Sequence, residues 1–498
     1  MSSSLAVLSA TSFSLFILWV VYCGYCLYSN YVEARKIGVL IRVIRISHLN
    51  YLWLLIDKRV ISMVKQLPGP LGDNSFTRYN YRGWHEHDST RSHDEMGDAF
   101  VVVTPDQNWL YLANPDALTD TCACNKSLNE QCNAVVWTEA ASLTTEMARY
   151  WSDKQCFSTV AEDVRTLSLH ILCRACFGKS FPFVGHDQVE ENSPSASFRR
   201  SLLTIIDHAL LILALGPKFF NKPWLPRRLR RLGEACATFK DHMTRLYHDE
   251  QRTILNDYKA DSSTTLVASL IRASQHRQAG EGALTEAEIY GTMFVFSFAG
   301  HDTTSHALTF AMFYLAANPA VQAWLKEELV RVLGDRPCYE WDYHADFPRL
   351  QRCLAILCET LRLKTPVAES LRVEDKTHLV IPAGTLIIPS YVHVQKHTKY
   401  WGSEWKPSRW ISSTSGQRQF PFLGWSEGAR DCPGKKFSHV EWVATMAALF
   451  RDWKVDPLRY GQETSEDAQK RVLDMIETNT GYGELLLQLN DPERTPLV

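Results

Sequence analysis

One cysteine, Cys432, stands in the segment GWSEGARDCPGKKF, residues 424–437, together with glycines, a proline and basic side chains. A cysteine thiolate can ligate a haem iron and push electron density toward an O–O bond. This chemistry needs a lowered thiol pKa, which the start of a helix can provide. The apolar segment HVEWVATMAALF, residues 439–450, predicts such a helix directly after Cys432.

Other residues of this loop fit the same chemistry. Gly428 and Gly434 would let the backbone turn tightly and approach a flat ring without a Cβ clash. Arg430 could pair with a haem propionate through a charge-assisted fork. The alternative is a free cysteine in a surface turn or a small buried hydrophobe, which is what a lone cysteine usually is.

The longest helical pattern covers residues 284–319, LTEAEIYGTMFVFSFAGHDTTSHALTFAMFYLAANP. Thr285, with Glu288 three residues later, predicts a capping box at its start. Pro319 ends it, because proline cannot continue a helix. At about 1.5 Å per residue the helix is long enough to cross a whole domain. Its middle is apolar on nearly every side, which predicts burial.

The centre of this helix, AGHDTT at residues 299–304, is polar among phenylalanines. Thr303 follows Ala299 by four residues, so its hydroxyl can bond the Ala299 carbonyl and open the helix locally. Asp302, next to it, could relay protons to this notch. The alternative is a polar patch that faces a loop.

A second motif, CETLR, places Glu359 and Arg362 three residues apart on one face of a predicted helix. Its neighbours are apolar, so the pair is expected to be buried. A buried pair needs further partners, because losing one partner costs about 3–5 kcal/mol. Arg409 in KPSRW, residues 406–410, is the candidate third member.

Together and in this order, the motifs resemble those of the cytochrome P-450 family of haem-thiolate monooxygenases. The resemblance implies a mainly α fold with small β-sheets (α+β) and one long central helix over the haem. It implies that Cys432 is the axial ligand of the iron of haem b and that Asp302 and Thr303 deliver protons. Glu359, Arg362 and Arg409 would form the structural triad. The remaining residues implied to contact the cofactor are Ala299, Arg430, Gly434 and, as a second propionate candidate, Arg372.

Phrases such as PGKKFSHVEW most resemble fungal members of that family, which implies a role in secondary metabolism. The implied reaction inserts one atom of O2 into an apolar small molecule, with electrons from an NADPH-dependent flavoprotein reductase. The substrate would lie against Phe294, Phe298, Ala299 and Thr303. A formal net charge of −2 gives no electrostatic basis for binding nucleic acid.

The N-terminal segment LAVLSATSFSLFILWVVYCGYCLY, residues 5–28, carries no charge, and basic residues follow it but do not precede it. It predicts a transmembrane anchor over residues 1–30, with the rest of the chain in the cytosol at the endoplasmic reticulum membrane. A cleaved signal peptide is the alternative. An amphipathic segment with a Pro-rich hinge is expected at 31–70 and the haem domain at 71–498. Hairpins are predicted at 99–115 and 378–390, and helices over 135–275 with a break at 222–231.

The chain departs from the family near residues 118–130, where a helix carrying Trp-x-x-x-Arg is expected and the sequence is shortened. Trp137 is followed four residues later by Ala141, and Trp151 by Gln155, so neither motif supplies the arginine. A non-catalytic or degenerate member with weak or no haem binding is therefore one alternative function. A haem-thiolate isomerase or dehydratase is the other.

Overall fold

The structure is a computed structural model. It describes residues 2–47, 50–54, 56–81, 83–113, 130–185, 194–256, 265–276, 284–367, 382, 384–398, 401–411, 422–426, 431–482 and 486–498.

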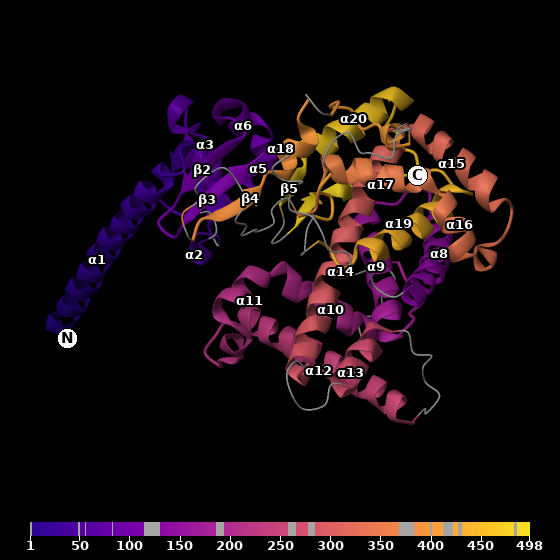
Figure 1. Ribbon diagram of the computed structural model, residues 1–498, viewed down its shortest axis with the longest axis horizontal. Helices are drawn as coiled ribbons and strands as arrows, with labels where there is room; N and C mark the ends of the chain where they lie inside the picture. The colour runs from indigo at the N-terminus through magenta and orange to yellow at the C-terminus, as the bar shows by residue number, and fades with distance from the viewer. Residues whose placement is uncertain are drawn as a thin grey trace. The chain divides into compact units, whose positions relative to one another are not determined.

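These residues form helices and short strands (Figure 1). The helices are α1 (Ser2–Arg35), α2 (Tyr51–Leu54), α3 (Asp57–Lys65), α4 (Ser75–Tyr79), α5 (Trp84–Asp88), α6 (Arg91–Met96), α8 (Glu130–Ser152), α9 (Val160–Phe177), α10 (Pro194–Asp207), α11 (Ala209–Leu215), α12 (Arg227–Asn256), α13 (Leu266–His276), α14 (Glu286–Ala316), α15 (Pro319–Leu333), α16 (Tyr343–Asp346), α17 (Gln351–Leu363), α18 (Tyr391–Lys396), α19 (Lys435–Phe450) and α20 (Ser465–Thr478). The strands are β1 (Leu40–Val43), β2 (Ala99–Val103), β3 (Asn108–Leu112), β4 (Leu386–Pro389), β5 (Thr480–Tyr482) and β6 (Leu487–Leu489). The predicted mainly α fold with small sheets is confirmed.

The chain folds into two compact units. The first unit comprises Met1–Cys122, Ala368–Ser403 and Gln419–Leu423. The second comprises Ala123–Val367, Glu404–Arg418 and Gly424–Val498, and therefore contains Cys432, α14 and α17.

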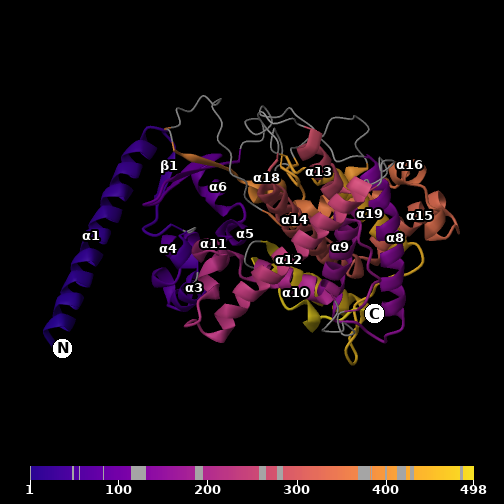
Figure 2. The same ribbon diagram turned by 90° about the horizontal axis from the view of Figure 1, so that it is seen from below.

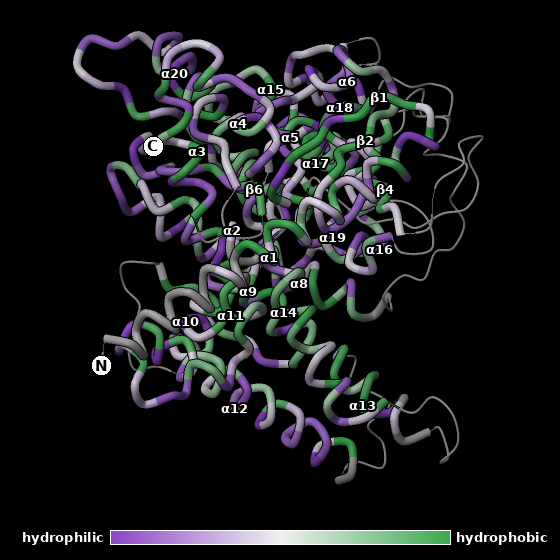
Figure 3. Tube along the Cα trace, turned by 90° about the vertical axis from the view of Figure 1, so that its left-hand side faces the viewer, coloured by the Kyte–Doolittle hydropathy of each residue, from purple (hydrophilic) through white to green (hydrophobic). Residues whose placement is uncertain are grey.

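The sheet of the first unit has the strand order β1-β2-β3-β4. β2 and β3 pair antiparallel, with Phe100 opposite Tyr111, which confirms the hairpin expected here. β2 is hydrophobic along its whole length (Figure 3), as expected for a strand that is buried on both faces. Phe100 packs with Tyr79 and Trp84 on one face, whereas Val101 lies in a separate apolar cluster on the other.

The N-terminal residues also take part in the first unit. The end of α1 joins its core, since Ala34 is fully buried and the Asn30 Nδ2 donates a 2.9 Å hydrogen bond to the Thr104 carbonyl. β1 pairs with β2, so part of the segment expected at 31–70 belongs to the sheet. Among the described residues no helix combines the length and apolar character needed to cross a bilayer, so the transmembrane helix is not supported.

In the second unit α14 packs along α9, and α8 packs against both α9 and α19 (Figures 1 and 2). The capping box that starts α14 is present, because the Thr285 hydroxyl accepts from the Glu288 backbone while the Glu288 carboxylate accepts from Thr285. Gly300 of α14 faces Leu172 of α9. A Cβ at Gly300 would lie 2.8 Å from the Leu172 Cδ1 atom of α9, so a larger residue here would require the Leu172 side chain to shift.

One local prediction needs correction, and another falls partly outside the described residues. The break between helices was expected over residues 222–231, but the non-helical stretch ends at Pro226. The basic residues 227–231 are the first residues of α12. In the hairpin expected at 378–390, the first half lies outside the described residues, and the second half is β4, which pairs in parallel with β3.

Glu441 of α19 is a buried acid in the core of the second unit. Its side chain is fully buried, and neither carboxylate oxygen has a hydrogen-bond partner in the described structure. Burial raises the pKa of Glu441 to about 8, although the nearby Ser168 of α9 lowers it slightly. The carboxyl is therefore mostly protonated near neutral pH.

We predict that Glu441→Gln removes a pH dependence of stability. The folded chain keeps this proton up to about pH 8, whereas the unfolded chain loses it near its ordinary pKa of about 4.3. The free energy of unfolding should therefore fall by up to about 1.4 kcal/mol for each pH unit between about pH 5 and about pH 8, and glutamine should remove this slope. Urea unfolding at several pH values measures it. The exposed Glu234→Gln of α12 is the control, and an equal change in both variants would contradict the prediction.

Candidate active site

The Cys432 loop is closed by backbone hydrogen bonds. The Cys432 N–H donates to the Trp425 carbonyl at 2.9 Å, and the Lys435 N–H donates to the Cys432 carbonyl at 3.2 Å, directly at the start of α19. The Trp425 indole donates to the Ser438 hydroxyl at 3.0 Å and lies edge-on to the His439 ring. Ser426 has a φ of 60°, a left-handed conformation that turns the chain within the loop. The loop is thus fixed at both ends to the first turns of α19.

The thiol of Cys432 is accessible to solvent. Enough protein nevertheless surrounds it that burial raises its pKa, and Asp431 adds to this effect. The Gly434 N–H and Lys435 act in the opposite direction but do not outweigh it. The sequence predicted that the helix start lowers the pKa of the Cys432 thiol, and for the structure this prediction is wrong. Loss of contact with water raises the pKa by more than the start of α19 lowers it.

The residues around Cys432 fit a thiolate-bound haem iron. The sulfur is accessible, and a hydrogen bond from the Gly434 backbone favours its thiolate form. A Cβ at Gly434 would lie 3.8 Å from the Cys432 Sγ atom, so glycine keeps a side chain away from the sulfur. The other cofactor contacts proposed from the sequence, Arg430 and Arg372, lie outside the described residues, as does Gly428.

The hydrogen bond that the sequence predicted within α14 is present. The Thr303 hydroxyl donates to the Ala299 carbonyl at 2.8 Å. Ala299 is exposed, and Val295, one turn earlier, is 56% exposed, although the second half of the helix is buried. Phe298 stacks on Phe294 with the ring centroids 6.2 Å apart. This face of α14 therefore presents apolar side chains and one hydroxyl to an accessible space.

The alternative for this motif was a polar patch that faces a loop, but Asp302 does not face one. Its carboxylate is buried and accepts two hydrogen bonds from Arg165 of α9, at 2.5 Å to Oδ1 and 3.0 Å to Oδ2. Burial by itself would raise the pKa of Asp302, but His301, His306 and Arg165 outweigh it and lower the pKa. Sequence reasoning missed Arg165, because it precedes Asp302 by 137 residues and has no motif of its own.

The structure brings together Glu359, Arg362 and Arg409. Glu359 and Arg362 are both fully buried, and two hydrogen bonds of 3.0 Å join their side chains. The Arg409 Nε donates to the same carboxylate at 3.0 Å. The Lys406 backbone and the Trp410 indole, both missed from the sequence, donate at 2.8 Å each. Five donors therefore satisfy one buried carboxylate.

Trp137 and Trp151, considered above for the missing helix, are core residues. Trp137 is 1% exposed and contacts the rings of Trp341, Tyr343 and Phe347. Trp151 stacks on Phe157 at 4.5 Å and donates to the Asp163 carboxylate at 2.9 Å. Neither side chain is arranged to contact a cofactor. Residues 118–129, where the sequence is shortened, lie outside the described part.

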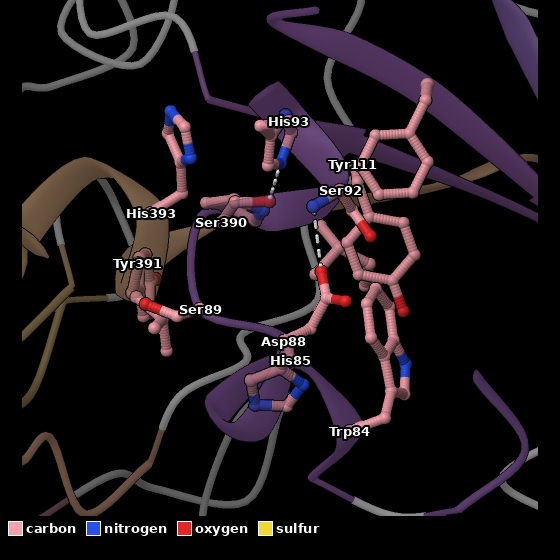
Figure 4. Close-up of a pocket in the computed structure, with 14 residues that line it drawn as sticks. Trp84, His85, Asp88, Ser89, Ser92, His93, Tyr111, Ser390, Tyr391 and His393 are labelled. Carbon is pink, nitrogen blue, oxygen red and sulfur yellow. Dashed lines mark hydrogen bonds between the residues drawn. The ribbon is translucent and has the colours of Figure 1, made fainter. Parts of the chain in front are cut away.

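A pocket in the first unit is not a second active site (Figure 4). Its His93 Nε2 lies 2.7 Å from the Ser390 hydroxyl, and its His93 and His393 rings are 4.6 Å apart. The volume is about 20 Å³, which is room for about one water molecule. Across the described residues no group of three His, Cys, Asp or Glu side chains could hold a metal ion.

Comparison with known proteins agrees with this geometry. The family model for cytochrome P450 matches residues 118–481. A cytochrome P450 monooxygenase of Arthrobotrys oligospora is 24% identical, over 85% of this chain and 87% of its own. The phomenoic acid biosynthesis cluster cytochrome P450 monooxygenase of Leptosphaeria maculans is 27% identical over 66% and 62%. A cytochrome P450 monooxygenase of Penicillium roqueforti is 22% identical over 85% and 87%. All three relatives are fungal, as the sequence of the Cys432 loop predicted.

We predict that Arg165→Met strongly destabilises the protein, because it leaves the Asp302 carboxylate buried without its cation. Breaking such a pair costs about 3–5 kcal/mol. Adding Asp302→Asn to this variant should restore most of the loss, since the buried charge is then gone. Urea unfolding of the two single variants and the double variant measures the coupling. The control is Arg174→Met on an exposed position of the same helix. Independent, additive effects of the two substitutions would contradict the ion pair.

Proposed function

The chain belongs to the cytochrome P450 family, and on this premise we propose that it binds haem b through Cys432 and inserts one atom of O2 into an apolar small molecule. The family makes it an oxygen-incorporating oxidoreductase with a haem-iron cofactor. The observation that carries the proposal is the accessible Cys432 sulfur, held in a loop that hydrogen bonds close onto the start of α19.

A haem iron with a thiolate ligand supplies the activation of O2. The Cys432 Sγ would hold the iron, and the Gly434 N–H would stabilise the negative charge on that sulfur. The hydrogen bond from Gly434 thereby favours the thiolate form that ligation requires. Glu359, Arg362 and Arg409 would act as the structural triad of the second unit, which also contains Cys432.

Proton delivery is assigned to Thr303 and Asp302. The Thr303 Oγ1 lies on the accessible face of α14, where it can hold a proton near a bound substrate. Asp302 lies about 100° further round the helix and is held by Arg165. To reach Thr303, its carboxylate must leave this ion pair. Arg165 therefore controls when the acid is free to exchange a proton.

The proposed substrate is an apolar small molecule. The accessible face of α14 offers Val295, Phe298 and Ala299, which carry no charge and would bind by excluding water. For the electrons we propose an NADPH-dependent flavoprotein reductase, because members of the family generally use a redox partner.

A second candidate is a non-catalytic member that does not retain haem. The raised pKa of the Cys432 thiol favours it, because a thiol that resists ionisation is a poorer ligand. The monooxygenase candidate predicts a haem-thiolate band when the reduced protein binds carbon monoxide, and the non-catalytic candidate predicts no such band.

We predict a strongly red-shifted Soret band when the purified, reduced protein binds carbon monoxide, because Cys432 ligates the iron as a thiolate. Cys432→Ser should lose this band. Cys156→Ser is the matched control, since Cys156 is also exposed but lies outside the site. A band that survives in Cys432→Ser would contradict the ligand assignment. No band from folded wild-type protein would favour the non-catalytic candidate.

We also propose that α1 attaches the enzyme to the endoplasmic reticulum membrane. Apolar and aromatic side chains are exposed along its middle, among them Trp19 at 59% and Tyr22 at 66%. The later part of the helix, from Leu27 to Ala34, packs against the sheet instead. A bilayer surface would bury the exposed middle of α1, while the later part of α1 would stay packed against the sheet.

We predict that deleting residues 2–22 moves the protein from the membrane fraction to the soluble fraction without unfolding it. The deletion removes the exposed apolar residues from Ile17 to Tyr22 but keeps Asn30, which bonds to Thr104, and Ala34 in the core. Sedimentation of cell membranes and circular dichroism measure the two effects. Tyr339→Ser, which removes an aromatic residue that is 79% exposed elsewhere, is the control. An unchanged membrane fraction would contradict a role for α1.

A further inference from the structure

His301 precedes Asp302 in α14, and its side chain is fully buried. The ring Nδ1 atom lies 2.7 Å from the Ser297 carbonyl, which places the proton of the neutral ring on Nδ1. The Nε2 atom is then an acceptor, and it has no hydrogen-bond partner in the described part of the chain. A buried polar atom without a partner costs free energy, so this nitrogen needs an explanation.

The Nε2 atom lies next to the acid to which proton delivery is assigned. It is 3.9 Å from the Asp302 Oδ1 atom, which accepts a hydrogen bond from Arg165. While Nε2 carries no proton, two acceptor atoms are neighbours and do not attract each other. A proton on Nε2 would turn the ring into a cation beside the carboxylate and would give Nε2 a group to which it can donate.

Arg165 has a second carboxylate nearby. Its Nη2 atom lies 3.8 Å from the Oδ1 atom of Asp207, the last residue of α10. The side chain of Asp207 is 56% exposed, whereas that of Asp302 is 2% exposed. Arg165 can therefore turn outward and still have an anionic partner. Asp302 would then keep a buried charge without its cation, which is strongly unfavourable.

The charges around His301 link its proton to the position of Arg165. Burial lowers the pKa of His301, Asp302 raises it, and the positive charge of Arg165 lowers it again. Arg199 of α10 also lowers this pKa, by less. Because the charge of Arg165 opposes a second positive charge beside Asp302, His301 gains a proton more readily once Arg165 has turned away.

We propose that His301 is a positioning residue for proton delivery, which takes up a proton on Nε2 and replaces Arg165 as the cation of Asp302 when Arg165 turns to Asp207. The proton comes from water, and no other bond forms or breaks. A guanidinium group does not give up its proton, so Arg165 can neutralise Asp302 but cannot supply it. An imidazolium can do both, because it can pass the proton on to the carboxylate.

The inference rests on the proposed delivery of protons through Asp302 and Thr303, and it names the group from which Asp302 receives them. The sequence has a second candidate in His306, whose Nε2 atom lies 3.8 Å from the Asp302 Oδ2 atom. Burial lowers the pKa of His306 to about 4, so this ring takes up a proton only in acidic solution. Neither of its nitrogens is among the buried atoms that lack a partner in the described residues. His306 is therefore the matched control.

The test is a pH titration of the histidine ring signals by NMR, in the full chain labelled at histidine. His301→Gln and His306→Gln assign the two signals. In the wild type His301 should titrate below about pH 6.5, the ordinary value for histidine, because its pKa is lowered. In Arg165→Met it should titrate above about pH 6.5, while His306 stays neutral there. Arg174→Met, at an exposed position of α9, should leave both titrations unchanged.

The proposal is overturned if His301 stays neutral in Arg165→Met at about pH 6, or if His306 takes up the proton instead. The stability of this variant gives a second criterion, since a protonated His301 should replace the lost cation. Arg165→Met should therefore be less destabilised at about pH 5 than at about pH 7. A variant that is unfolded at the lower pH, while Arg165→Met with Asp302→Asn is folded, would also overturn the proposal.

A measurement on the haem-loaded enzyme tests the role in delivery. With a reductase and NADPH, His301→Gln should increase the share of electrons recovered as hydrogen peroxide at least about twofold, because protons reach Asp302 more slowly. His306→Gln should not change this share. Equal shares in wild type and His301→Gln would overturn the role of His301 in delivery. The NMR titration needs no haem, so its failure is distinguishable from the absence of a carbon monoxide band.

Discussion

The buried carboxylate of Glu359 is the interaction on which the second unit depends most. It is fully removed from water and carries a charge, so every lone pair must find a donor. Arg362 supplies two of these donors from the same helix, and residues 406–410 supply the other three. If one of these five donors were missing, the buried Glu359 carboxylate would be incompletely paired. Residues 406–410, which precede the Cys432 loop in the sequence, therefore have one favourable position against α17.

The contact between α14 and α9 imposes a second constraint. Gly300 allows the two helices to approach so closely that a Cβ would collide with Leu172. One turn of α14 thereby divides its polar residues between two environments. Asp302 faces α9 and is neutralised by Arg165, whereas Thr303 lies on the accessible side and bonds to its own helix. The acid and the hydroxyl are neighbours in sequence, but their surroundings have opposite polarity and accessibility.

Some features of the site could be predicted because they depend on nearby residues. The capping box at Thr285, the bond from Thr303 to Ala299 and the pairing of Glu359 with Arg362 all join residues three or four positions apart in a helix. Arg165, Lys406 and Trp410 could not be predicted in this way, since their partners are distant in the sequence. The pKa of Cys432 was also missed, because desolvation depends on how much protein surrounds the sulfur.

The sequence by itself determined the family, the mainly α fold, the long helix α14 and the cysteine that we propose as the iron ligand, since these follow from local periodicity and from motifs in a fixed order. Only the tertiary structure decided which charges are paired and which remain exposed. Within the described part of the chain, Asp302 has a cation while Glu441 has none, and the six lysines and arginines from Lys218 to Arg231 have no acidic partner. The physical reason is that the energy of a charge depends on its distance from other charges and from water, and folding sets both distances.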